Sequence, residues 1–299
     1  MGTSNSNKGT SGHGTPLIPS WLDAGDSDNG PSSPYPEPLP NGNGEPDGDQ
    51  TGHSPMSPVL PPIPAPADAD RFTNARNNFS RFVGSGGRNR ANLGRAISGY
   101  VSRVSGGSRQ AARRMGTSRR VGTRLLDFLS NAASHGTREA LRSLNLEELA
   151  GNPIEVIFLG LADYICPEGG TVDDGIARDA FIQTITDLTD NGITNLDGLT
   201  FDQVGTVFEL YVTHSIEAKL YNDIGNGMLV ISPSVASAER IQTQLHDFIR
   251  HGVADAITAA RAALEALTSN RISQFVDNIY RQAFSVLEYL GNAAANGSL

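Results

Sequence analysis

The residues most able to carry chemistry in this sequence are its histidines, its single cysteine and a few adjacent pairs of acidic residues. His246 and His251 are five positions apart. Two histidines that ligate one metal ion from the same helix are usually four apart, and no acidic residue stands at a matching offset. His135 and His214 are isolated in the sequence. The spacing therefore predicts surface histidines and no metal site.

Nucleophilic and acid–base catalysis are not indicated either. Cys166 precedes a proline at the expected end of a helix, with no basic residue beside it, which is typical of a buried structural thiol. The pairs Glu147–Glu148 and Asp173–Asp174 lie at expected helix starts, where the helix dipole favours carboxylates. Gly84–Gly87 lacks the lysine of a phosphate-binding loop. We therefore expect a protein that is not an enzyme, with no catalytic residues and no cofactor.

The arginines indicate a binding surface more strongly than the residues above indicate a catalytic or metal site. Residues 71–124 contain thirteen arginines and no acidic residue, and the densest part holds Arg113, Arg114, Arg119 and Arg120. Such a cluster can bind the phosphates of a nucleic acid. It can also lie against an acidic surface, either of residues 125–299 or of a partner protein, and the exclusive use of arginine favours such forked, partly buried pairing. The sequence leaves both interpretations open.

The N-terminus is the other candidate site. Removal of Met1 would leave the unhindered amine of Gly2, followed by Thr3 and Ser4 in an arm without bulky residues. A modifying enzyme could accept such an arm in a deep pocket. The first six residues also satisfy the loose myristoylation pattern, although one acyl chain anchors a protein only weakly. The remaining alternative is an ordinary tail in which the glycine has no role.

The chain divides into three segments by composition. Residues 1–70 hold fourteen of the seventeen prolines, and one lysine against nine acidic residues, so this arm and its proline-rich spacer are expected to be disordered. An apolar island within the arm is expected to dock on a partner or on the rest of the protein, the alternative being a hydrophobic stretch that stays in solvent. Its residues are Leu17, Ile18, Trp21 and Leu22.

The other two segments predict an all-α fold. Residues 71–124 form a marginally helical, arginine-rich segment, in which Phe72, Ala75, Phe79 and Phe82 line one face of a first helix. Residues 125–299 form a helical bundle. In this bundle the apolar helix at 154–159 is expected to be buried at the centre, Thr200 and Gln203 form a capping box, and two long helices close the chain. One strand-like run, 226–233, has no partner strand.

Other classes of protein are excluded by composition. A single cysteine rules out a disulfide framework. No apolar run approaches the roughly 20 residues that a membrane span needs, and the N-terminus lacks the features of a secretory signal. We expect a soluble, cytoplasmic protein.

Several short motifs resemble the QatB family, the B component of the bacterial Qat anti-phage defence system. They are the arm Met1–Ser6, the island Pro16–Trp21, the run Arg113–Gly116, and Ile165–Gly170 followed by Ala177–Ala180. The resemblance implies a non-enzymatic component of a four-gene operon, whose other members are an ATPase (QatA), a QueC-like enzyme (QatC) and a TatD-like nuclease (QatD). It also implies that the QueC-like partner attaches a deazaguanine group to the amine of Gly2, with Thr3 and Ser4 as the recognised neighbours.

Two functions therefore compete. In the first, the protein is a scaffold and the substrate of Gly2 modification, with its helical body bound to the ATPase. In the second, it is an adaptor that binds phage DNA through Arg113, Arg114, Arg119 and Arg120 and delivers it to the nuclease. A lipid-anchored sensor is a third, weaker alternative.

Overall fold

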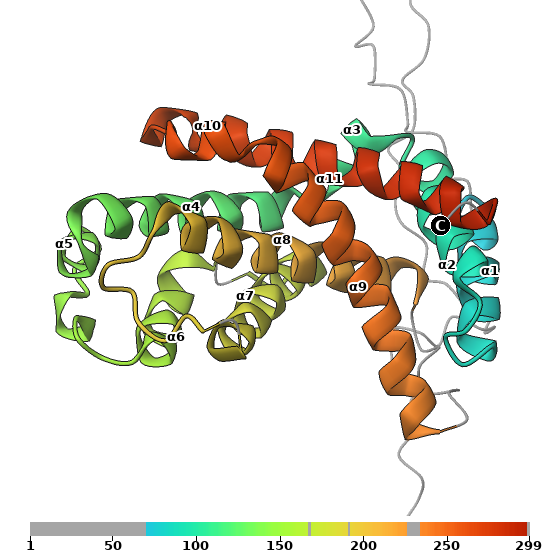
Figure 1. Ribbon diagram of the computed structural model, residues 1–299, viewed down its shortest axis with the longest axis horizontal. Coiled ribbons are helices and arrows are strands. Elements are labelled where there is room, and N and C mark those ends of the chain that lie inside the picture. The colour runs from blue at the N-terminus through green and yellow to red at the C-terminus, as the bar shows by residue number, and fades with distance from the viewer. Residues whose placement is uncertain (1–69, 167–168, 191, 226–233, 298–299) are drawn as a thin grey trace, which may run out of the picture. The chain divides into compact units, whose positions relative to one another are not determined.

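The computed structural model describes residues 70–166, 169–190, 192–225 and 234–297, and every regular element in these ranges is helical (Figure 1). The predicted all-α fold is therefore confirmed. The expectations for the arm, the spacer and the apolar island lie outside the described residues, as does the strand-like run 226–233. No helix in the described ranges combines the length and apolarity that a bilayer-spanning segment needs.

Eleven α-helices and three short turns make up the described part of the chain. The α-helices are α1 (Thr73–Gly84), α2 (Arg90–Gly99), α3 (Ser108–Arg114), α4 (Gly116–His135), α5 (Thr137–Arg142), α6 (Ile154–Ile165), α7 (Val172–Asp190), α8 (Phe201–Ile224), α9 (Val235–Ala259), α10 (Arg261–Glu265) and α11 (Ile272–Ala295). A π-helical turn (Tyr100–Val104) follows α2, and 3-10 turns lie at Glu147–Leu149 and Ser269–Arg271.

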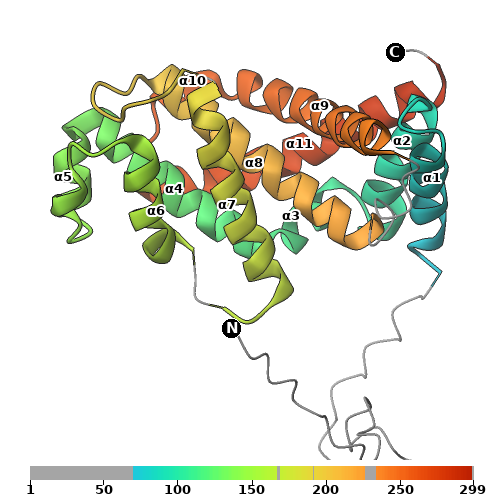
Figure 2. The same ribbon diagram turned by 90° about the horizontal axis from the view of Figure 1, so that it is seen from below.

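The arginine-rich helices pack into the same core as the rest of the described chain. α1 packs on α2, and α2 packs on the C-terminal helix α11 (Figure 2). Phe79 and Phe82 of α1 and Leu93 and Ile97 of α2 are each at most 1% exposed. The predicted apolar face of the first helix is thus confirmed at Ala75, Phe79 and Phe82, whereas Phe72 lies at the N-cap and is half-buried. Helices that are weakened by several glycines gain their stability from this burial, because tertiary packing outweighs propensity.

The expected boundary after residue 124 falls inside α4. This helix begins with the polar stretch from Gly116 and continues into Leu125, Phe128 and Leu129, which are all buried. It packs against α7, α8 and α11. The arginines at its start are therefore rigidly connected to the bundle.

The expectation that the helix at 154–159 is buried at the centre of the bundle is wrong. α6 buries one face, with Ile157, Phe158 and Leu161, against α4 and α7. Its other face is uncovered: Leu159 is 57% exposed and Tyr164 is 50% exposed. A helix that is apolar on two faces need not be packed on both. In the described part of the chain, other helices pack against only one face of α6.

Helices α7, α8 and α9 pack side by side and position the polar cluster described below. α8 begins at the predicted capping box, in which the Thr200 hydroxyl accepts from the Gln203 amide and the Gln203 side chain accepts from the Thr200 amide. The apolar stripe of the first long C-terminal helix is buried, but the helix is interrupted at Ala260, between α9 and α10.

Candidate functional site

Of the residues expected to be modified, to dock on a partner or to bind an anion, the described ranges include only the four arginines. Gly2, Thr3 and Ser4, expected at the modification site, and Leu17, Ile18, Trp21 and Leu22, expected to dock on a partner, lie outside the described residues. The four arginines fall on both sides of one turn. Arg113 and Arg114 end α3, and Arg119 and Arg120 lie in the first turns of α4. Met115, only 1% exposed, anchors the turn between them.

The four side chains have different surroundings. Arg119 forms an ion pair of 2.8 Å with Asp277 of α11, and Arg120 donates to the Thr117 hydroxyl at 3.0 Å. Within the described ranges, Arg113 and Arg114 make no hydrogen bond or ion pair. Two of the four guanidinium groups are therefore available for an external anion.

A pocket of about 570 Å³ lies between α3 and the start of α11. It brings Arg109, Arg113 and Arg119 together with Arg271 and Arg281, which come from far along the chain. The only acidic residue in its lining is the aspartate that pairs with Arg119. The five guanidinium groups leave an excess of positive charge in this pocket.

A second pocket, of about 410 Å³, shares Arg113 with the first. Arg113, Arg114 and Arg120 line it together with Lys219 of α8. Lys219 is partly neutralised, because its ammonium group lies 3.0 Å from the Asp173 carboxylate and 3.3 Å from that of Asp223. We call the two pockets together the basic face. Arginine forks on such a surface suit phosphate or carboxylate groups.

Other arginines of residues 71–124 serve the fold. Arg76 donates two hydrogen bonds to the carbonyl of Asp223 in the last turn of α8. Arg95 donates to the carbonyl of Ala295 at the end of α11, and Arg124 donates to that of Ile165 at the end of α6. The last carbonyls of a helix lack partners within the helix and carry its negative dipole end. These three arginines thus cap three helices, a role that their positions in the sequence do not reveal.

Cys166 is a buried thiol, as predicted. It is fully shielded from solvent, and burial raises its pKa to about 11, although Arg178 and Arg124 act in the opposite direction. A thiol with this pKa is almost entirely protonated near neutral pH. It is therefore a poor nucleophile and a poor metal ligand.

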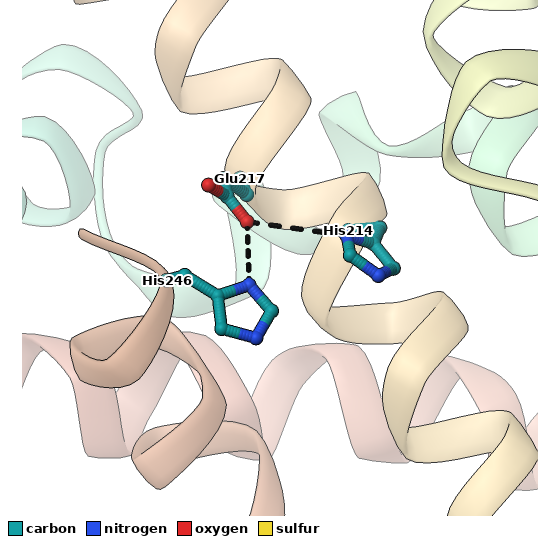
Figure 3. Close-up of side chains that lie close together, drawn as sticks. All are labelled: His214, Glu217 and His246. Atoms are coloured by element: carbon teal, nitrogen blue, oxygen red, sulfur yellow. Dashed lines mark hydrogen bonds and ion pairs between the residues drawn. The ribbon is translucent and has the colours of Figure 1, made fainter. Parts of the chain in front are cut away.

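A polar cluster lies between α7, α8 and α9. The spacing predicts surface histidines, but His214 and His246 are half-buried here. His214 and Glu217 are three residues apart on α8 and face His246 of α9 (Figure 3). A Glu217 carboxylate oxygen lies between the two imidazole rings, 2.9 Å from His246 Nδ1 and 4.0 Å from His214 Nδ1. Asp187 of α7 lies 2.8 Å from His214 Nε2. We call these four residues the histidine cluster.

One member of the histidine cluster, His246, has a raised pKa. The hydrogen bond to Glu217 raises the pKa of His246, and the charges of Glu217 and Asp187 add to this effect, while partial burial and Arg250 oppose it. A pocket of about 830 Å³ adjoins all four residues. The sequence spacing does not predict the cluster because its members come from three helices, and only the pair on α8 is close in the sequence.

Together these features describe an all-α protein with clustered arginines on one face and a separate histidine–carboxylate cluster. The family model described as "Qat anti-phage system associated protein QatB" matches residues 106–287, from the start of α3 into α11. The chain belongs to the QatB family. It is therefore a component of an anti-phage defence system, in which it works with the other proteins of that system. Searches of curated proteins and of solved structures found no match.

Proposed function

We propose that this chain is a non-enzymatic scaffold of the Qat system and the substrate of a modification at Gly2 by the QueC-like partner. Membership of the QatB family is the observation that carries the proposal. In the proposed reaction, the free amine of Gly2 attacks an activated carboxyl group of acyl-adenylate type. An amide bond forms, AMP leaves, and the amine loses a proton. Thr3 and Ser4 would be read by the modifying enzyme as the neighbours of Gly2.

The scaffold role is supported by the charged and apolar surfaces of the body. The uncovered face of α6, with Val156, Leu159 and Tyr164, offers an apolar contact surface, and such surfaces are often sites of protein–protein interaction. We assign it to the ATPase, and we assign the apolar island Leu17, Ile18, Trp21 and Leu22 of the arm to a partner as well. The working compartment would be the cytoplasm, where phage DNA enters.

The test is the intact mass of the N-terminal peptide after co-expression with the QueC-like partner. We expect an added mass on the peptide that begins at Gly2, and no addition when the partner is omitted. Substitution of Thr3 and Ser4 by bulky residues should lower the modified fraction. An unmodified Gly2 in a strain that still resists phage would overturn the conjugation.

A second candidate function is favoured by the basic face. Five arginines around one pocket and four cations around the other would suit the phosphates of DNA. In this alternative, the protein delivers phage DNA to the TatD-like nuclease. Binding to DNA that weakens steeply with salt and depends on Arg113, Arg114, Arg119 and Arg120 would support it.

A further inference from the structure

The side chains of the histidine cluster are arranged as metal ligands are. One imidazole nitrogen from His214, one from His246 and one carboxylate oxygen of Glu217 all lie within 4.8 Å of one another. Zinc holds nitrogen and oxygen ligands at roughly 2.0–2.1 Å in a tetrahedron, which sets neighbouring ligand atoms about 3.3 Å apart. The separations of 2.9 Å and 4.0 Å from the Glu217 oxygen lie on either side of this value. Small side-chain rotations would therefore complete the geometry.

Asp187 prepares His214 for this role. Its carboxylate can only accept a hydrogen bond, so the 2.8 Å contact places a proton on His214 Nε2. In the neutral ring, the lone pair is then on Nδ1, which faces the Glu217 oxygen at a distance too long for a hydrogen bond. A carboxylate that holds the second nitrogen of a ligating histidine is the usual support of a metal site.

The surroundings allow an ion to enter and to keep a further ligand. His214 is 11% exposed and His246 is 25% exposed at their side chains, so the nitrogens are shielded but reachable. The adjoining pocket of about 830 Å³ is lined by polar groups as well as apolar ones, including Asp179, Gln183 and Asn222. Three protein ligands beside an accessible space correspond to a zinc site whose fourth position is taken by water.

We propose that His214, Glu217 and His246 bind one divalent transition-metal ion, with zinc as the chemically preferred ion and Asp187 as a positioning residue. The ion would join α8 to α9 and, through Asp187, to α7. The choice of zinc rests on the ligands, because two imidazoles and one carboxylate suit zinc better than calcium or magnesium, which prefer oxygen. In the metal-free protein, His246 Nδ1 carries a proton and donates it in a hydrogen bond to the Glu217 carboxylate. The ion would replace this proton between the two groups.

The test uses the full chain, made without a polyhistidine tag and stripped with a chelator. Calorimetric titration with zinc chloride should give one site per chain, and cobalt chloride should give the visible absorption of a four-coordinate ion. Glu217→Gln keeps the size of the side chain but removes the anionic ligand, and His246→Ala removes one nitrogen. Both variants should lose the stoichiometric site, and Asp187→Asn should weaken binding by about 10-fold to 100-fold.

His251→Ala is the matched control, because His251 is an exposed histidine of the same helix α9. It should bind zinc as the wild type does. A wild-type protein that binds no zinc would overturn the proposal. So would Glu217→Gln or His246→Ala proteins that bind zinc with unchanged affinity and stoichiometry, since binding would then come from other histidines. Circular dichroism of each variant confirms its fold, and the isosteric Glu217→Gln keeps the test decisive if His246→Ala is unstable.

Discussion

Gly94 of α2 and Gly291 of α11 meet at a helix crossing where neither position has room for a side chain. A Cβ atom at Gly94 would lie 2.5 Å from the carbonyl oxygen of Gly291, and one at Gly291 would lie 2.7 Å from the carbonyl oxygen of Gly94. Both obstacles are backbone atoms that cannot rotate away. This close approach attaches the arginine-rich helices to the C-terminal helix.

Gly94→Ala should therefore destabilise the protein, although alanine favours helix more than glycine does. Overpacking of this kind costs about 1–3 kcal/mol, which corresponds to a loss of several degrees in Tm in a thermal melt. Gly99→Ala is the control at the C-terminal end of α2, where the nearest atom to an added Cβ is 4.0 Å away. It should be neutral or stabilise by up to about 1 kcal/mol. Equal melting temperatures for the two variants would contradict the close crossing.

The buried thiol of Cys166 should resist modification until the protein unfolds. Its pKa of about 11, against an ordinary 9.0, lowers the thiolate fraction near pH 8 about a hundredfold, and burial limits access further. Alkylation by iodoacetamide should be slow in the native protein and fast in guanidinium chloride. Rapid labelling without denaturant would show that the thiol is accessible.

The same thiol should make stability depend on alkaline pH. Because folding raises the pKa of Cys166, its contribution is fully present below about pH 9 and is lost as the pH rises towards 11. The free energy of unfolding, measured by urea titration, should therefore fall across this range. Buried tyrosines also have raised pKa values, so the measure is the difference between the wild type and Cys166→Ala. A difference that is constant with pH would contradict the prediction.

The uncovered face of α6 should be needed for assembly but not for folding. Leu159→Glu places a charge on a side chain that is 57% exposed, so Tm should change little, while co-purification with the ATPase partner should fall at least about tenfold, which corresponds to about 1.4 kcal/mol. Val235→Glu is the control, because Val235 is an exposed apolar residue at the start of α9. Undiminished co-purification of Leu159→Glu would move the interface elsewhere.

If the basic face binds DNA, affinity should fall steeply with salt and depend on the arginines of the α3–α4 turn. Replacing Arg113, Arg114, Arg119 and Arg120 by alanine should abolish binding in an electrophoretic or anisotropy assay. Each phosphate that is no longer neutralised should reduce the slope of log affinity against log salt by about one. Arg103→Ala is the control, because this exposed arginine lies outside both pockets. Binding that survives the quadruple substitution would exclude the adaptor function.

The sequence alone predicts local features of the fold, such as the buried face of a helix or the residue at which it begins. The spacing of Phe79 and Phe82 identified the buried face of α1, and the pair Thr200 and Gln203 identified the start of α8. Helical periodicity and capping act over three or four residues, so they need no knowledge of the rest of the fold. The motifs that resemble the QatB family are likewise short stretches of sequence.

Relationships between distant helices depended on packing. The sequence of an apolar helix such as α6 does not show whether one of its faces or both are packed. Leu159 is exposed because no neighbouring helix in the described part of the chain covers it. His246 meets Glu217, and Arg113 shares a pocket with Arg271, because helices that are far apart along the chain bury their apolar faces against each other. Such contacts arise because many apolar side chains are buried together, and this burial has no preferred direction. The spacing of residues within one helix therefore does not predict them.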